Sequence, residues 1–263
     1  MTIKVAVQGA LGQMGREVMK AVSAAPDLEL VGACDSKAGD TSSTVDGIAG
    51  GILLSADLAS LLEATRPDVL VDFSLAAAVP QSAETAARAG VSLVIGTTGL
   101  SPEMLSRIEN LTKEYNIGAI VVPNFALGAI VMMELARIAA RHFDWAEIIE
   151  LHHEKKADAP SGTAIATARA MAASRDKAFE SPSAGNDRPS RGEEIDGVPV
   201  HSVRMPGLVA HQEVIFGALG QTLSIRHDTI NRESFMPGVL TAVREIPRHP
   251  GRFIFGLEKL LGF

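Results

Sequence analysis

The first 120 residues alternate between short β-branched runs and alanine-rich stretches whose apolar residues recur at helical spacing. Strands that alternate with helices of this length predict βαβ crossovers and a parallel sheet covered by helices on both faces. The expected strands are Ile3–Val7, Leu28–Ala33, Val69–Phe73, Val91–Ile95 and Ala119–Val122. The expected helices are Met14–Ala24, Ala76–Ala89 and Pro102–Tyr115. This pattern predicts an α/β fold with an N-terminal doubly wound parallel-sheet domain.

The pattern changes after Asn124, where strands begin to follow one another at short spacing. Such spacing predicts an antiparallel or mixed sheet, and hence a second, smaller α+β domain built on a mixed sheet. The strands expected there are Glu147–His152, Val200–Arg204, Glu213–Leu219 and Thr222–Asp228. Helices are expected over residues 128–142, 163–174 and 233–245. Two polar stretches without periodicity are expected to be loops, the second of them mobile: Lys37–Gly51 and Ser181–Gly197.

The balance of charges limits the partners that the chain can have. The formal net charge is 24 − 31 = −7, which argues against binding to nucleic acid or to an anionic membrane surface. The most apolar stretch, residues 117–140, contains a proline, Glu134 and Arg137, so no membrane segment is expected. The N-terminus has no signal core, and the single cysteine, Cys34, excludes an intrachain disulfide and an all-cysteine metal site. These features predict a cytoplasmic protein.

A glycine-rich turn follows the first expected strand. It reads Gly9-Ala10-Leu11-Gly12-Gln13-Met14-Gly15 and leads into the first expected helix. In that context, glycines let backbone N–H groups approach a pyrophosphate, which then lies at the positive end of the helix. The alternative is a tight turn with close helix packing and no ligand. The turn favours a dinucleotide-binding, Rossmann-like domain and leaves that alternative open.

An acidic residue at the end of the second strand strengthens this interpretation. Asp35 lies 35 − 15 = 20 residues beyond Gly15, about where a carboxylate accepts hydrogen bonds from the adenine ribose of NAD. Alternatively, Asp35 is a solvated carboxylate at a strand end. Asp35 would repel a 2′-phosphate, whereas Lys37 would attract it, so the choice between NADH and NADPH stays open.

Two further loops follow expected strands of the same sheet. Gly96-Thr97-Thr98-Gly99 comes after Val91–Ile95, and Pro123-Asn124-Phe125 comes after Ala119–Val122. Ligands of doubly wound sheets bind beyond the carboxyl ends of the strands. Both loops are therefore candidates for the nicotinamide end of a dinucleotide, although each has an ordinary turn as its alternative.

The densest cluster of chemically active side chains is the segment from Glu150 to Thr163, which contains His152, His153 and Lys156. Metal binding is one interpretation, but adjacent His residues point to opposite sides of a strand and no metal site is expected. A solvated charged loop is another. The segment ends in Ser161-Gly162-Thr163 at a helix start, where N–H and hydroxyl groups bind carboxylates. The residues favour a pocket for an anionic small molecule with a proton donor beside it.

These segments together resemble one enzyme family. The pattern His152-His153-x-x-Lys156-x-Asp158-x-Pro160-Ser161-Gly162-Thr163 is similar to the substrate loop of 4-hydroxy-tetrahydrodipicolinate reductases, also called dihydrodipicolinate reductases. The glycine turn, Val71-Asp72-Phe73-Ser74 and the two loops just described match the family in the same order. The likeness extends from Val5 to about Val243.

The resemblance implies an activity and a role for each matching residue. The family uses NADH or NADPH to reduce a cyclic dicarboxylated imine to tetrahydrodipicolinate, in the diaminopimelate route to lysine. His152 and Lys156 would be the acid–base pair, and His153, Ser161, Gly162 and Thr163 would bind the substrate carboxylates. The residues expected to bind the pyrophosphate and ribose are Gly9, Ala10, Leu11, Gly12, Gln13, Met14, Asp35 and Lys37. Those expected at the nicotinamide end are Gly96, Thr97, Thr98, Val122, Pro123, Asn124 and Phe125.

The resemblance also implies the domain organisation. Residues 1–123 and 232–263 would form the dinucleotide-binding domain, and residues 124–231 the domain for substrate binding and oligomerisation in a homotetramer. An alternative is another NAD(P)-dependent oxidoreductase of similar build that acts on a small amino-acid-derived acid, for which Cys34 would be a badly placed nucleophile. A dinucleotide sensor without activity is a third possibility. Arg204 and His211 receive no role, and Arg204 is expected to be a surface charge at a strand end.

Overall fold

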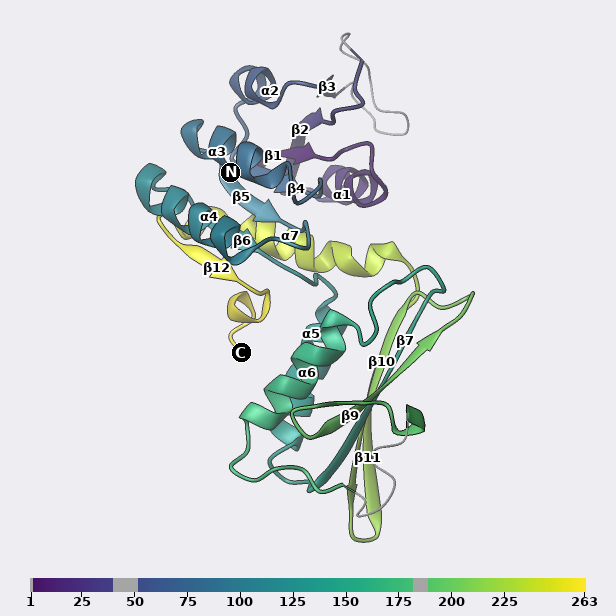
Figure 1. Cartoon of the computed structure of the whole chain (residues 1–263). Coiled ribbons are helices and arrows are strands. Elements are labelled where there is room, and N and C mark those ends of the chain that lie inside the picture. The colour runs from purple at the N-terminus through teal and green to yellow at the C-terminus, as the bar shows by residue number, and fades with distance from the viewer. Residues whose placement is uncertain (1, 40–51, 182–188) are drawn as a thin grey trace. The chain divides into compact units, whose positions relative to one another are not determined.

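The structure is a computed structural model that describes residues 2–39, 52–181 and 189–263. The chain divides into two compact units. The first consists of Met1–Phe125 and Phe235–Phe263, and the second of Ala126–Ser234. The sequence predicts the corresponding boundaries at 123/124 and 231/232. Figure 1 shows that the C-terminal segment, in yellow, lies with the purple and blue elements of the first unit.

The first unit contains a seven-stranded sheet in which all neighbouring strands are parallel. The spatial order is β12-β6-β5-β4-β1-β2-β3. The strands are β1 (Ile3–Gln8), β2 (Leu28–Cys34), β3 (Leu53–Ser55), β4 (Val69–Asp72), β5 (Ser92–Ile95), β6 (Ala119–Val121) and β12 (Phe253–Phe255). From β1 the chain proceeds first toward β3 and then toward β6, so the topological switch point lies between β1 and β4. Ligands of such sheets bind at this point, beyond the carboxyl ends of the strands.

Helices cover this sheet because their apolar residues recur on one face. In α1 the side chains of Val18, Met19 and Val22 are fully buried, at the spacing of a single helix stripe. Ser101 caps the start of α4 by accepting a hydrogen bond from the backbone N–H of Met104. The helices of the unit are α1 (Gln13–Ala24), α2 (Leu58–Thr65), α3 (Val79–Arg88), α4 (Pro102–Tyr115) and α7 (Met236–Glu245). The predicted doubly wound domain is confirmed.

The second unit contains a five-stranded mixed sheet with the order β11-β10-β7-β9-β8. The central pair β7 and β9 is parallel, and the remaining pairs are antiparallel. The strands are β7 (Trp145–His152), β8 (Glu193–Ile195), β9 (Val198–Arg204), β10 (Ala210–Ala218) and β11 (Gln221–Thr229). Two helices, α5 (Leu127–Ala139) and α6 (Gly162–Ala173), lie on one face of this sheet (Figure 1). The predicted smaller α+β domain on a mixed sheet is therefore confirmed.

The sheet of the second unit buries one face and leaves the other partly open. Ile148, Val200, Val214 and Phe216 point into the core formed with α5 and α6, and each is at most 1% exposed. Along β7, buried residues alternate with partly exposed ones, which is the period-two pattern of a half-buried strand. Glu150 occupies a buried position in this pattern although it carries a charge.

Several elements differ from the sequence prediction. The prediction of a structureless loop over Ser181–Gly197 is wrong for its described end, because residues 189–191 form a 3₁₀ turn and β8 pairs with β9. Strand β3, helix α2 and strand β12 were not predicted. Most of the polar stretch Lys37–Gly51 lies outside the described residues. Among the described residues, no helix is both long enough and apolar enough to cross a membrane.

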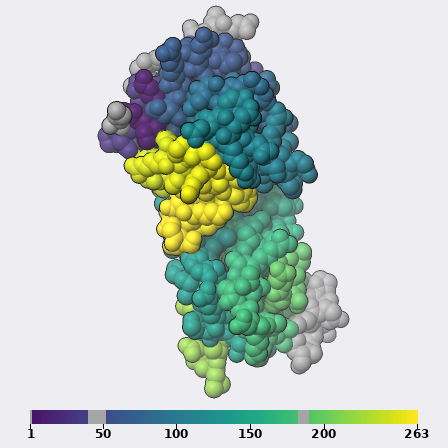
Figure 2. Space-filling model, turned by 90° about the vertical axis from the view of Figure 1, so that its left-hand side faces the viewer, coloured from purple at the N-terminus to yellow at the C-terminus, as the bar shows by residue number. Residues whose placement is uncertain are grey.

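The C-terminal strand and helix are integral parts of the first unit. Strand β12 extends the parallel sheet by pairing with β6, and the Arg244 guanidinium on α7 forms hydrogen bonds of 2.7 and 2.9 Å with Asp27. Figure 2 shows the yellow C-terminal atoms in one continuous surface with the purple and blue atoms of the N-terminal segment. The sheet is thus completed by residues that are far away in the sequence.

Candidate functional site

The glycine turn after β1 is shaped by close backbone packing. Gly9 has a positive φ of 76°, and a Cβ atom there would lie 2.7 Å from the Phe73 carbonyl oxygen. A Cβ on Gly15 would lie 2.2 Å from the Gly9 carbonyl oxygen. Both glycines are therefore required by the protein's own packing, which the alternative interpretation of a tight turn had anticipated.

Gly12, the middle glycine of the motif, lies at the end of a helix. It is the N-cap residue of α1, where no side chain caps the exposed N–H groups of the first turn. The positive end of the α1 dipole is thus available to an anion. A Cβ on Gly12 would lie 3.1 Å from the Gly9 carbonyl oxygen, so packing also favours glycine there, while the uncapped helix end supports the interpretation of the turn as a pyrophosphate site.

The turn opens onto a cavity of about 300 Å³ in the first unit. Five residues assigned to the cofactor from the sequence line this cavity: Gly9, Leu11, Gly12, Asp35 and Lys37. Gln8, Ser36, Phe73, Ser74, Leu75 and Ala78 complete its wall. Ala10, in contrast, is fully buried, and its backbone N–H donates to the Cys34 carbonyl oxygen at 3.1 Å. Five of the eight residues expected to bind the pyrophosphate and ribose therefore lie around one cavity, whereas Ala10, Gln13 and Met14 do not line it.

Asp35 is a buried residue rather than a solvated carboxylate. It is 9% exposed. Its Oδ2 accepts a hydrogen bond from the Leu11 backbone N–H at 2.9 Å, and its Oδ1 accepts one from the Lys37 backbone N–H at 3.0 Å. The alternative of a solvated strand-end group is wrong. Each carboxylate oxygen has a further lone pair, so Asp35 can fix the turn and still accept from a ribose hydroxyl.

The loops after β4 and β5 are joined by a buried carboxylate. Asp72 is fully buried, and its Oδ1 accepts from the Ser74 backbone N–H at 2.8 Å and from the Ser74 hydroxyl at 2.6 Å. The Thr97 hydroxyl lies 3.2 Å from the Ser74 carbonyl oxygen. Thr97 is therefore engaged in joining the two loops, while Thr98 is exposed.

Aromatic packing fixes the same end of the sheet. The Phe73 and Phe125 ring centroids are 5.6 Å apart, and a Cβ on Gly96 would lie 2.2 Å from the Phe73 ring. Gly96 and Phe125 thus have a packing function that the sequence alone had not indicated. Val122 is 1% exposed, whereas Pro123 is exposed.

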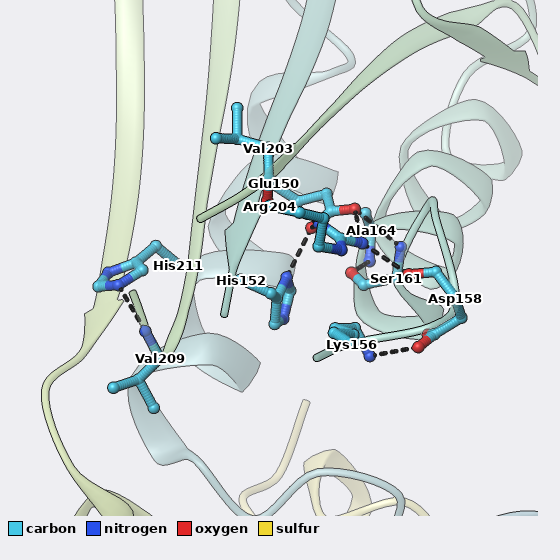
Figure 3. A network of polar contacts seen from close by, with 10 residues as sticks. All are labelled: Glu150, His152, Lys156, Asp158, Ser161, Ala164, Val203, Arg204, Val209 and His211. Carbon is cyan, nitrogen blue, oxygen red and sulfur yellow. Dashed lines mark hydrogen bonds and ion pairs between the residues drawn. The ribbon is translucent and has the colours of Figure 1, made fainter. Parts of the chain in front are cut away.

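In the second unit, a buried charge network lies beside the charged loop (Figure 3). The Glu150 carboxylate is completely buried. Arg204 donates to both of its oxygens, at 2.8 and 2.7 Å, and the His152 Nδ1 lies 2.6 Å from Oε2. The Ser161 backbone N–H donates to Oε1 at 3.1 Å. Burial raises the pKa of Glu150, but the hydrogen bonds from His152, Arg204 and Ser202 outweigh burial and lower this pKa to about 2.

The loop between β7 and α6 contains the remaining predicted residues. Lys156 Nζ forms an ion pair of 2.8 Å with Asp158, and the Lys156 side chain is 23% exposed. His153 and Lys155 are exposed. Figure 3 shows the His152 ring below Glu150 and the Lys156 side chain beside it, with its Nζ directed toward Asp158. The two candidate proton donors therefore occupy one part of the second unit.

The start of α6 is a second helix N-terminus among the candidate site residues. Ser161 caps the helix by accepting from the Ala164 backbone N–H at 3.2 Å. A Cβ built on Gly162 would meet no atom within 4 Å among the described residues. Unlike Gly9 and Gly15, Gly162 is not required by packing, so its missing side chain leaves space for a ligand at the helix N-terminus.

Sequence reasoning missed Glu150 and misjudged Arg204. The Arg204 side chain is only 18% exposed and holds a buried carboxylate, so the prediction of a surface charge was wrong. A signal for Glu150 existed, because it shares the buried face of β7 with Ile148, and a charged residue in such a position requires a partner. His211, which also received no role, forms a 2.7 Å contact with Asp228.

The structure also bears on two alternatives from the sequence, Cys34 as a nucleophile and a metal site. Burial, together with the charges of Asp35, Asp57 and Asp72, raises the pKa of Cys34 to about 12. A thiol with such a pKa does not form the thiolate that a nucleophile requires. Within the part of the chain that the structure describes, no group of three His, Cys, Asp or Glu residues could hold a metal ion.

The geometry defines a class of protein. One unit is a parallel sheet with a glycine-lined cavity at its switch point, and the other presents His152 and Lys156 near a helix N-terminus. The first unit has the fold and cavity of a dinucleotide-binding domain and the second contains groups that can transfer a proton, which together favour the class of NAD(P)-dependent oxidoreductases.

Comparison with known proteins gives the family. Residues 3–125 match the family model described as dihydrodipicolinate reductase, N-terminus, and residues 128–261 match the one described as dihydrodipicolinate reductase, C-terminus. The chain belongs to the 4-hydroxy-tetrahydrodipicolinate reductase family, whose members are NAD(P)H-dependent oxidoreductases of lysine and diaminopimelate biosynthesis.

Individual relatives agree with this result along the whole chain. A 4-hydroxy-tetrahydrodipicolinate reductase from Dehalococcoides mccartyi is 54% identical over 259 residues, which cover 98% of each chain. The corresponding reductase from Moorella thermoacetica is 48% identical, covering 100% of this chain and 99% of the relative. The solved structure of a dipicolinate-bound dihydrodipicolinate reductase from Paenisporosarcina sp. TG-14 is similar with a TM-score of 0.86 and 37% identity, over 98% of this chain and 99% of that chain.

Proposed function

We propose that this chain uses NADH or NADPH to reduce the cyclic dicarboxylated imine derived from 4-hydroxy-tetrahydrodipicolinate, giving tetrahydrodipicolinate. The observation that carries this proposal is the charged loop, in which His152 and Lys156 accompany a helix N-terminus with space above Gly162. The family membership of both halves of the chain supports it.

The first unit would hold the cofactor. The uncapped start of α1 and the cavity lined by Gly9, Leu11 and Gly12 fit a pyrophosphate, and Asp35 has lone pairs for the adenine ribose. We assign the nicotinamide end to the loops at Gly96–Thr98 and Val122–Phe125, which follow β5 and β6. The reduced nicotinamide supplies the hydride when it is bound.

The second unit would hold the substrate. We assign its carboxylates to His153 and to the turn formed by Ser161, Gly162 and Thr163, where helix dipole and backbone donors favour an anion. The similar structure from Paenisporosarcina is described as bound to dipicolinate, a planar dicarboxylate. This ligand supports a small dicarboxylate as the substrate class.

Lys156 and His152 would manage the proton that must accompany the hydride. Hydride addition to the conjugated ring leaves an electron-rich enamine carbon, which takes a proton from a nearby acid. Lys156 has a long, flexible side chain that is 23% exposed, and its Nζ forms an ion pair of 2.8 Å with Asp158. His152 lies four residues earlier and can relay a proton to the same place.

We propose that the chain assembles into a homotetramer through the mixed sheet. Helices α5 and α6 cover one face of this sheet (Figure 1). On the other face, Ile149, Leu151 and Ile215 are partly exposed and Trp145 is 40% exposed. Apolar side chains on an open sheet face are typical of an interface. Light scattering of the purified chain measures the assembly: a mass of four chains supports the proposal and a monomer contradicts it.

We propose the cytoplasm as the compartment in which the chain works. The support is that the single cysteine, Cys34, is buried as a free thiol, so the fold uses no disulfide of an oxidising compartment.

A substrate-dependent assay tests the activity. Freshly generated 4-hydroxy-tetrahydrodipicolinate is added to the full chain with NADH or NADPH, and the loss of reduced cofactor is followed by absorbance. We expect oxidation that depends on both the substrate and the chain. Oxidation with an amino-acid semialdehyde, and none with the cyclic substrate, would favour the alternative oxidoreductase.

A further inference from the structure

Glu150 contacts both parts of the proposed substrate site although it is completely buried. Its Oε2 lies 2.6 Å from His152 Nδ1, and its Oε1 accepts from the Ser161 backbone N–H at 3.1 Å. We propose that Glu150 is the positioning residue of the site: it holds His152 as the tautomer protonated at Nδ1 and fixes the start of α6. This inference rests on the proposed function of His152.

The tautomer follows from the donors and acceptors around the carboxylate. An ionised carboxylate can only accept hydrogen bonds. Arg204 donates to both oxygens, which keeps the group ionised, so His152 Nδ1 must be the donor in the 2.6 Å contact. The Nε2 atom is then the position at which the ring gains or loses a proton, on the side away from Glu150.

Arg204 joins this pair to the loop that contains Lys156. Its Nη2 atom donates to the Asp158 carbonyl oxygen at 2.6 Å as well as to Glu150. One buried ion pair therefore fixes strand β7, strand β9 and the loop at the same time. Such outer contacts orient a functional histidine and hold its ring in one tautomer.

The same strand contains a matched group that lacks these connections. Glu147 contacts His201 Nε2 at 2.8 Å and pairs with Arg191, so it too is a glutamate between a histidine and an arginine. Its side chain is 38% exposed, in contrast to the buried Glu150, and it contacts neither the loop nor α6 in the described structure. Glu147 is therefore a control for removing a carboxylate from β7.

Nitrogen-15 NMR of the histidine rings tests the proposal on the full chain. The variants are Glu150→Gln and Glu147→Gln, and a His152→Gln spectrum assigns the His152 signals. At a pH where the ring is neutral, we expect the wild type to show His152 protonated at Nδ1. Glu150→Gln removes the anionic acceptor, so the population should shift toward Nε2–H and kcat should fall by about 10–100-fold. Glu147→Gln should leave both the His152 signals and kcat unchanged.

Two outcomes would overturn the proposal: a wild-type His152 protonated at Nε2, or a folded Glu150→Gln chain with the wild-type kcat. If Glu150→Gln fails to fold, the wild-type tautomer alone decides. A failure of the proposed role of His152 in proton transfer is a separate result. It would be shown by a His152→Gln chain that retains the wild-type kcat, and it does not depend on which tautomer the wild type has.

Discussion

The two candidate half-sites depend on different kinds of groups: a glycine turn in the first unit and a network of charged side chains in the second. The cavity of the first unit lies against a glycine turn: a Cβ on Gly9, or on the nearby Gly15, would collide with the main chain, and Gly12 leaves the start of α1 without a side-chain cap. The site of the second unit is formed by side chains held by the buried Glu150–Arg204 pair. Added atoms should therefore destabilise the fold at the first site, whereas at the second site the removal of charges should lower activity.

The largest effect is expected at Lys156. Its replacement by Ala removes the proposed proton donor, so kcat should fall by about 10²–10⁴-fold, the usual contribution of general acid catalysis. Steady-state kinetics with both substrates measures this change. Lys155→Ala is the matched control, because Lys155 is exposed and lies next in the sequence. Equal losses in the two variants would show that the assignment of the loop residues is wrong.

The buried carboxylate predicts a pH dependence of stability. The pKa of Glu150 is about 2 in the folded chain, below its ordinary value of 4.5. The stabilisation is therefore complete above the unfolded pKa and is lost as the pH falls from about 4.5 toward 2, an amount of about 3 kcal/mol. Urea unfolding between about pH 5 and pH 3 follows roughly the first half of this loss.

The matched variants identify the source of this pH dependence. Glu150→Gln should flatten the fall in the free energy of unfolding, and Glu147→Gln should flatten it less, because the more exposed Glu147 is screened by solvent. Identical pH profiles for the wild type and Glu150→Gln would contradict the account of the buried pair.

A pair of glycine variants compares the two half-sites directly. Gly15→Ala places a Cβ 2.2 Å from a backbone oxygen and should lower the free energy of unfolding by about 1–3 kcal/mol. Gly162→Ala meets no described atom within 4 Å, so stability should not fall, while the KM for the substrate should rise. Denaturant unfolding and steady-state kinetics check both. A destabilised Gly162→Ala chain would mean that this glycine serves packing after all.

The smallest effect is expected for the choice of cofactor. Asp35 favours free ribose hydroxyls and Lys37 attracts a 2′-phosphate, so the two effects oppose one another. A single charge–phosphate interaction contributes about 1–3 kcal/mol, or about 5–150-fold in affinity. Titrations with NADH and NADPH should therefore differ by no more than this range. A preference above about a thousandfold would show that one of the two side chains does not reach the ribose.

The parts of the molecule that could be predicted from sequence are continuous segments. The β-branched runs of the parallel sheet, the glycine turn and the loop from His152 to Thr163 each contain their own signal within a few consecutive residues. Their local geometry follows from the period of the residues and from helix termini.

The parts that were missed depend on residues far apart in the chain. Glu150 and Arg204 are separated by 54 positions and meet only because β7 and β9 pair in register. Strand β12 likewise joins β6 across more than half of the sequence. Short strands such as β3 and β8 gain their stability from pairing with a neighbour, so their own three residues have no clear pattern.

Calorimetric titration tests the division between the two half-sites most directly. The wild type and Lys156→Ala are each titrated with NADH and then, with the cofactor present, with dipicolinate as the dicarboxylate probe. Because NADH is assigned to the cavity at the glycine turn of the first unit, its Kd should agree within about twofold between the two chains, while Lys156→Ala should bind dipicolinate about tenfold or more weakly. An unchanged Kd for dipicolinate, or a loss of NADH binding in Lys156→Ala, would contradict the account.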